Sequence, residues 1–424
     1  MDSYVSPKTS SNPITTTTYY ETPSLSTEIV ANNDDLLTEI LVRLPIKSLL
    51  RFKCVSKRWL SFISNPHFCY RRTPFHNTAC GLFLIRHSMH INPEFDFVRL
   101  NHNNSQLSQA PFRTLSFVND PFGIKILQSC NGLFLCCSFH AFDGRKKYYV
   151  YNPTTKHHTI LPPPLPVRSE TSSTVLGFSL AFDPSKSTSY KVVCVRNLNY
   201  EFVETQHQIK IYSPEEGSWR LSSGIFSPSL PPYDLQFDGG VFWNGSIHWI
   251  DTYGTAALYF NLHTECLSKM IFPPIPEGWE EWDGRKFGYF GVSGDHLNLI
   301  GMYDPARSTH FNVYEMERDY SSWFVKFHVD LDEVPTAFPE MIRSSSDPLH
   351  DLDHYLFHVI SVIWCDVEEE SYLVLHIPGK MIVYYLKSKT FKKLCDFDDV
   401  GTDGLLWYWG WSNAYQYIES LACV

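Results

Sequence analysis

VFWNGSIHWI, at residues 241–250, is the stretch that decides the fold of this chain. It holds two short runs of apolar and aromatic residues, separated by the dipeptide Asn244-Gly245. Asn-Gly between such runs is the strongest short-range signal for a β-hairpin with a two-residue turn. Residues 241–243 and 247–250 are therefore expected to form paired antiparallel strands.

Similar short runs continue on both sides of this hairpin, from Ala79 onward. Turn dipeptides such as Asp143-Gly144, Gly294-Asp295 and Pro378-Gly379 separate them. No convincing helical stretch interrupts the region, so it is predicted to be all-β. The further strands are expected at 81–86, 132–137, 148–151, 192–195, 209–212, 297–302, 311–314, 372–377 and 381–385.

A loose repeat runs through the same region. Each repeat has a triplet that begins with the aromatic residue at the end of a strand; a polar turn follows, and then a Thr or Trp and an apolar residue. The repeat returns at intervals of 48 to 71 residues, the scale of a four-stranded propeller blade. Because radial blades leave only short sheet edges, a propeller of about six blades is predicted, with a distorted β-sandwich or stacked-sheet domain as the alternative. The triplets begin at Tyr151, Tyr212, Phe260, Tyr314 and Tyr385.

The N-terminal part has a different, helical pattern: DDLLTEILVRLPIKSLLRFKCVSKRWLSFISNPHF at residues 34–68. Leucine and isoleucine recur there at helical spacing until Pro45, which ends the first helix. Asn33 or Asp34 is expected to cap this helix. A second helix is predicted over residues 47–52, and a third from the cap Ser56 to Asn65-Pro66. Three helices of this size have too little interior to bury all their leucines, so such a unit normally docks on another protein.

The chain therefore divides into three expected parts. Residues 1–33 form a Ser/Thr-rich tail that is expected to be disordered. Residues 34–72 form the helical unit, and residues 73–424 form the β domain.

The formal net charge of the chain is −10, which argues against a nucleic-acid partner. The charge is uneven, since residues 34–72 carry three acidic and eight basic side chains. This basic segment indicates either an acidic partner or a solvated helix face.

Eleven cysteines are scattered along the chain without any C-x-x-C pair. They are interpreted as reduced core thiols of an intracellular protein, located in the nucleus, the cytoplasm or both. No basic and apolar N-terminal signal is present, and no apolar run approaches the length of a membrane span, so no membrane partner is expected.

Residues 34–68 resemble the F-box of plant-type F-box proteins. The resemblance rests on positions that include Leu44-Pro45, Lys47-Ser48-Leu49, Cys54-Val55-Ser56 and Pro66-His67-Phe68. The β region is similar to the kelch-like F-box-associated domain of the same family, through phrases such as Tyr151-Asn152-Pro153-Thr154 and Trp243-Asn244-Gly245. One departure stands at Asn32-Asn33, where the family usually has Leu-Pro.

The resemblance implies a substrate-recruiting subunit of an SCF-type ubiquitin ligase. The F-box would dock on the small adaptor, which links it to a cullin scaffold and a RING subunit, and the β domain would bind a target protein. The alternative for the adaptor-binding residues is an internal helical core, and Leu41 and Val55 fit either role. The adaptor contact is expected from Leu36, Ile40, Leu44, Pro45, Leu49 and Trp59.

Catalytic motifs are not found: the chain has no G-x-S-x-G elbow, no Walker A loop and no G-x-G-x-x-G loop. The cluster of His350, Asp351, Asp353 and His354 is interpreted as a solvated loop, so neither a metal nor a cofactor is expected. A propeller enzyme acting on a small molecule or sugar is one alternative function, and an adaptor-binding scaffold that does not ubiquitinate is another.

Two tryptophan clusters remain. Trp279 and Trp282, in a turn-rich segment, are expected either to bind the target or to pack between blades. The segment 406–411 is predicted to be a late strand that closes the ring against an early one.

Overall fold

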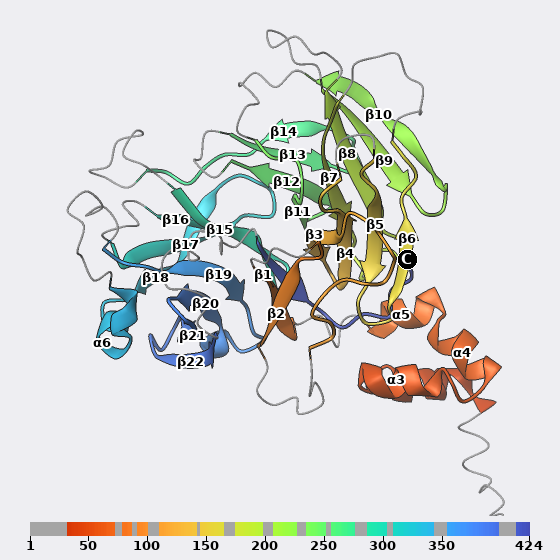
Figure 1. Ribbon diagram of the computed structural model, residues 1–424, viewed down its shortest axis with the longest axis horizontal. Coiled ribbons are helices and arrows are strands. Elements are labelled where there is room, and N and C mark those ends of the chain that lie inside the picture. The colour runs from red at the N-terminus through yellow and green to blue at the C-terminus, as the bar shows by residue number, and fades with distance from the viewer. Residues whose placement is uncertain are drawn as a thin grey trace, which may run out of the picture. The chain divides into compact units, whose positions relative to one another are not determined.

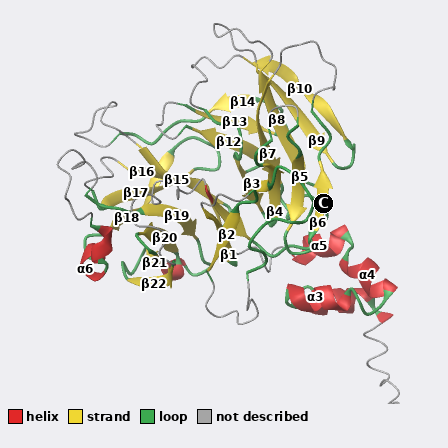
Figure 2. Cartoon of the chain, in the orientation of Figure 1, coloured by secondary structure: helices red, strands yellow, loops and turns green. Residues whose placement is uncertain are grey.

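The computed structural model describes residues 32–72, 79–86, 91–100, 110–141, 145–164, 174–197, 207–226, 235–251, 256–275, 286–302, 308–342, 354–397 and 413–424. The chain divides into two compact units, residues 1–44 and 45–424. The first unit contains α2 (Asp34–Leu41). The second contains α3 (Ile46–Phe52), α4 (Lys57–Ile63), α5 (Pro66–Arg72) and all of the strands (Figures 1 and 2). The expected tail at residues 1–33 lies almost entirely outside the described residues.

Six antiparallel sheets make up the β region, and each is one blade of a propeller. Blade 1 is β2-β1-β23, and the other blades follow chain order. Their strands are as follows. Blade 1 has β1 (Gly81–Arg86), β2 (Glu94–Arg99) and β23 (Ala414–Tyr417); blade 2 has β3 (Ile124–Cys130), β4 (Leu133–Ser138), β5 (Tyr148–Asn152) and β6 (His157–Ile160); blade 3 has β7 (Thr174–Ala181), β8 (Lys191–Asn197), β9 (His207–Ser213) and β10 (Ser218–Phe226). Blade 4 has β11 (Val241–Trp243), β12 (Ser246–Ile250), β13 (Ala257–Asn261) and β14 (Leu267–Lys269); blade 5 has β15 (Lys286–Ser293), β16 (His296–Met302), β17 (His310–Met316) and β18 (Trp323–Asp330); blade 6 has β19 (His358–Ile363), β20 (Tyr372–Ile377), β21 (Lys380–Tyr385) and β22 (Phe391–Asp396).

The ring is closed by pairing the end of the chain with its beginning. β23 pairs antiparallel with β1, with Leu82 opposite Gln416. The first strands of successive blades lie next to one another around the centre: β3, β7, β11, β15, β19 and β23. The prediction of about six blades is confirmed, and the sandwich alternative is excluded. The segment 406–411, expected to close the ring, lies outside the described residues, and the closing strand is β23.

The core is distributed rather than central. Six apolar clusters are present among the described residues, and each lies between two neighbouring blades. Blades 2 and 3 share one around Leu133 and Phe178, and blades 1 and 6 share another around Leu82 and Val374. Each sheet is therefore buried on both faces, which stabilises the ring as one body.

The sequence repeat marks the hairpin between the third and fourth strands of blades 2 to 6. Each of these hairpins has one residue with positive φ: Lys156, Gly217, Glu265, Tyr320 and Lys389. Tryptophans at the start of the fourth strand then fasten one blade to the preceding one. Trp219 Nε1 donates to Pro162 O at 2.7 Å, and Trp323 Nε1 donates to Ile271 O at 2.8 Å.

The structure differs from the expectation in its helices. The third helix was expected to be the last one before the β domain, but α5 begins at Pro66. Proline is favoured at the first position of a helix, where its missing N–H costs nothing, and Asn65 Oδ1 accepts from His67 N at 2.8 Å. A short helix, α6 (Val334–Ala337), also interrupts the β region. Among the described residues, no helix has the length and apolar character needed to cross a membrane.

Candidate functional site

Helix α2 is capped by the residue at which this chain departs from the F-box pattern. Asn33 Oδ1 accepts from the backbone N–H groups of Asp35 and Leu36 at 3.0 and 3.1 Å. Asp34 and Asp35 lie in the first turn, where the positive end of the helix favours them. The asparagine therefore replaces an apolar contact with a helix cap. Of the two expected caps, Asn33 is the one used.

Two apolar side chains on α2 remain exposed although their helix has a buried face. Leu36 and Ile40 are 45% and 48% exposed, while Leu37 and Leu41 are buried. Because residues four apart lie on one helix face, Leu36 and Ile40 form an adjacent apolar pair. Such a pair suits a protein partner, and Leu41, which fitted either role on sequence grounds, belongs to the interior.

The remaining predicted adaptor residues are placed differently from one another. Pro45 is exposed and precedes α3, while Leu44 and Trp59 are half-buried. The Trp59 ring packs edge-on against Phe52, with centroids 5.1 Å apart. Leu49 is fully buried within the chain, so in this state its side chain is not offered to a partner.

Between the end of α3 and the end of α4, two exposed apolar residues were not among the predicted adaptor contacts. Val55 is 66% exposed and Leu60 is 48% exposed. The predicted cap Ser56 is confirmed, since its Oγ accepts from Trp59 N at 3.2 Å, and this cap fixes the turn that presents Val55. Val55 is therefore not part of the interior of the helical unit.

Helix α5 is joined to the segment that follows the closing strand. The thiol of Cys69 donates to Leu421 O at 3.5 Å. Arg72 is buried, which lowers its pKa to about 10 against the opposing effect of Glu419. Burial likewise raises the pKa of Glu419, and Arg72 opposes this shift. The Cys69 bond and the burial of Arg72 indicate that α5 packs against the segment after β23.

Blade 2 holds the same segment from the other side. Asn152 Nδ2 donates to Ser420 O and Ala422 O at 3.1 and 2.8 Å, and Ser420 N donates to Thr154 Oγ1 at 3.1 Å. Gly132 lies directly under the segment, since a Cβ there would approach Ser420 Cβ to 2.5 Å. Residues 420–422 thus contact both α5 and blade 2.

The two faces of the propeller have connections of different length. On the face that holds residues 418–424, first and second strands are joined by turns as short as residues 131–132, 244–245 and 294–295. On the opposite face, third strands begin and fourth strands end. The connections there span residues 161–173, 227–240, 270–285 and 331–357. Long loops on a rigid scaffold are where binding residues concentrate.

The predicted target residues Trp279 and Trp282 belong to the connection 270–285 and lie outside the described residues. The metal-like cluster belongs to the connection 331–357, and only His354 of its four residues is described, in an exposed position.

The centre of the ring holds a cavity of about 150 Å³ lined by the first strands. Its polar side chains bond to the backbone of neighbouring strands. Gln128 exchanges two hydrogen bonds with Leu180, at 2.9 Å through Nε2 and 2.6 Å through Oε1. Gln416 Nε2 donates to Val292 O at 3.2 Å. The polar groups of this cavity therefore join blades.

Comparisons with known proteins agree with this architecture. Residues 33–71 match the family model described as "F-box domain". Residues 86–424 match the family model described as "F-box associated beta propeller domain". An F-box protein of Arabidopsis thaliana is 37% identical over 95% of this chain and 94% of its own length. A second F-box protein of that plant is 28% identical over 88% of this chain and 94% of its own length. The helices at residues 34–72, the six blades and these matches together show that the chain belongs to the F-box proteins with an F-box associated β-propeller domain.

Proposed function

We propose that this chain is the substrate-recognition subunit of an SCF-type E3 ubiquitin ligase. Its F-box docks on the small adaptor, and through it on the cullin and RING subunits, while the propeller recruits a target protein. The observation that carries the proposal is the exposed apolar pair Leu36 and Ile40 on a capped helix of an F-box. The chain adds effective concentration and orientation to the ubiquitin transfer, and the chemistry takes place on other subunits.

The adaptor contact is testable on this pair. Removing the exposed half of one aliphatic side chain from water is worth about 1 kcal/mol. An aspartate at either position would bury an unpaired charge in the interface, which costs considerably more. The double variant Leu36→Asp/Ile40→Asp is therefore expected to weaken adaptor binding at least a hundredfold.

The experiment is a pull-down of purified adaptor by the full chain, followed by calorimetric titration. The control variant is Ile160→Asp, which places one such charge at a 52% exposed apolar position on blade 2. Wild type and the control should bind alike. If the wild-type chain does not bind the adaptor, the proposed function fails.

We assign target recognition to the propeller face that carries the long connections. Helix α5 packs on the opposite face of the propeller, where residues 418–424 lie against Asn152 and Gly132. A target bound to the long connections therefore does not compete with α5 for the same surface. Proximity labelling with the proteasome blocked, comparing wild type with Leu36→Asp/Ile40→Asp, would identify target proteins that accumulate.

A non-degradative scaffold would bind the adaptor and the target equally well. Reconstituted ubiquitination with an identified target separates the two, since a scaffold gives no modified product. We place the working compartment in the nucleus or cytoplasm, an assignment that the eleven free cysteines support.

A further inference from the structure

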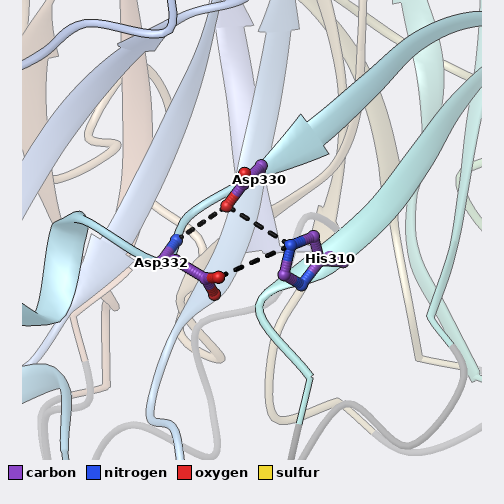
Figure 3. Close-up of side chains that lie close together, drawn as sticks. All are labelled: His310, Asp330 and Asp332. Atoms are coloured by element: carbon purple, nitrogen blue, oxygen red, sulfur yellow. Dashed lines mark hydrogen bonds and ion pairs between the residues drawn. The ribbon is translucent and has the colours of Figure 1, made fainter.

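Three ligand-type side chains converge at the edge of blade 5. His310 begins β17, Asp330 ends β18 directly opposite it in the strand register, and Asp332 follows two residues later. Their ligand atoms all lie within 4.8 Å of one another. Figure 3 shows the His310 ring directed toward both carboxylates. The cluster lies on the face of the propeller that carries the long connections.

The distances from Nε2 of His310 to the two carboxylates bear on whether the three side chains share a cation. Nε2 of His310 lies 3.4 Å from Asp330 Oδ1 and 3.6 Å from Asp332 Oδ2. A charge-assisted hydrogen bond between an imidazolium and a carboxylate closes to about 2.7–2.9 Å, so these separations are too long for one. Two ligands of a tetrahedral Zn²⁺, with bonds of 2.0–2.1 Å, lie about 3.3–3.4 Å apart. The separations therefore fit a cation shared between the side chains.

Neighbouring groups hold the three side chains in this arrangement. Nδ1 of His310 lies 3.4 Å from Thr309 Oγ1, and that hydroxyl donates to Asp332 Oδ1. Asp332 N donates to Asp330 Oδ1 at 3.0 Å. Nε2 of His310 faces both carboxylates, so the cluster places one ring nitrogen and two carboxylate oxygens around a common point. Supporting hydrogen bonds of this kind are what orient the ligands of metal sites.

We propose that His310, Asp330 and Asp332 bind a divalent cation of the Zn²⁺ type. One imidazole and two carboxylates are a donor set that zinc accepts, and three protein ligands leave a fourth position for water or another donor. The side chains of His310 and Asp332 are 58% and 61% exposed, so the ion enters without any opening of the fold. The site does not depend on the proposed ligase role.

The test uses the full chain, freed of metal with a chelator and titrated with Zn²⁺ by calorimetry. The matched control is His328→Ala, because His328 is also an exposed histidine of blade 5 and bonds to Asn312 Oδ1 instead. Wild type and His328→Ala should bind one ion with equal affinity. His310→Ala and Asp332→Asn should each weaken that binding at least tenfold, the loss expected for removing a ligand or its support.

Titration with Co²⁺ gives a second readout, since four-coordinate Co²⁺ absorbs visible light far more strongly than six-coordinate Co²⁺. Circular dichroism checks that each variant is folded, which is expected because all three side chains lie at the surface. Equal binding by wild type and His310→Ala would show only adventitious binding at surface histidines and would overturn the proposal. Absence of binding by folded wild type would overturn it as well.

Discussion

Gln416 on the closing strand β23 donates a hydrogen bond to the carbonyl of Val292 on β15, across the centre of the ring, at 3.2 Å. The two strands are not neighbours, since β19 lies between them in the ring. The same amide nitrogen lies 3.4 Å from Ser361 Oγ on β19. One side chain from the last strand thus joins three blades.

Replacing this side chain should loosen the ring. Gln416→Ala removes the donor and leaves the Val292 carbonyl without it, so a loss of about 1–3 kcal/mol in the free energy of unfolding is expected. Urea unfolding followed by tryptophan fluorescence measures the change. Gln236→Ala, at an exposed glutamine, should stay within about 0.5 kcal/mol of wild type. Equal stability of the two variants would show that the crossing bond contributes nothing.

The side chain of Asn33 is expected to stabilise α2 through its oxygen, which caps the helix, and not through its NH2 group. Asn33→Ala removes the acceptor for Asp35 N and Leu36 N, and is expected to destabilise α2 by about 1 kcal/mol. Asn33→Asp keeps an acceptor oxygen and should behave like wild type. Hydrogen exchange of the α2 amides, together with adaptor affinity, reports the effect. If Asn32→Ala weakens the helix as much as Asn33→Ala does, the cap is not the cause.

Gly132 and Gly245 form a matched pair for testing the support of residues 418–424. Both have positive φ, +89° and +74°, so alanine at either position costs about 1–2 kcal/mol of backbone strain. Only Gly132 would also bring a Cβ against Ser420, because nothing lies within 4 Å of a Cβ at Gly245. Gly132→Ala should therefore destabilise the chain more, and should also increase hydrogen exchange in α5. Equal losses in the two variants would contradict this packing.

The free energy of unfolding is expected to depend on pH, in part through the carboxyl group of Asp120. Burial acts to raise the pKa of its carboxyl, but hydrogen bonds from Tyr149, Ser138 and the Phe122 N–H outweigh it and hold the pKa below the usual value. Tyr149 Oη and Ser138 Oγ donate to Asp120 Oδ2 at 2.6 and 2.7 Å. Because the folded-state pKa is depressed, this contribution is complete above the unfolded-state pKa of about 3.9 and is lost as pH falls through the folded value.

Asp120→Asn should accordingly lower the unfolding free energy at pH 7 by about 1–3 kcal/mol. The gap between this variant and wild type should narrow as the pH of the urea titrations falls below about 3.9 and through the depressed folded-state pKa of Asp120. Asp366→Asn, at an exposed carboxylate, provides the control and should show no such narrowing. A gap that is constant across this pH range would mean that the carboxylate charge is not involved.

The sequence predicted the second and third strands of the blades well, because these strands are apolar and bounded by turn residues. β1 and β20, both second strands, begin and end where they were expected. Several first strands were missed because glycine and polar residues interrupt them, as in KFGYFGVS of β15. Some fourth strands were missed because they are short or exposed, such as LSK of β14. These strands form because they pair with the neighbouring strands of their blades, and not because of a local sequence pattern.

Sequence pattern likewise predicted only part of the candidate site. Periodicity identified the leucines of α2, but it could not separate exposed Leu36 from buried Leu37, since packing of the helix decides that. Leu49 illustrates the same limit, because an apolar residue at helical spacing fits both an interface and an interior. The triad of His310, Asp330 and Asp332 had no sequence signal, since strand pairing brings its first two members together across 20 residues of chain.

Closure of the ring by β23 also sets an order of events during synthesis. The helices at residues 34–72 leave the ribosome early, whereas the propeller lacks its first inner strand until residues 414–417 have emerged. At 5–20 residues per second, the interval between the two is roughly 20–70 s. Throughout that time the nascent chain can present Leu36 and Ile40 to an adaptor while it has no completed surface for a target. Assembly with the ligase can therefore precede the ability to select a substrate.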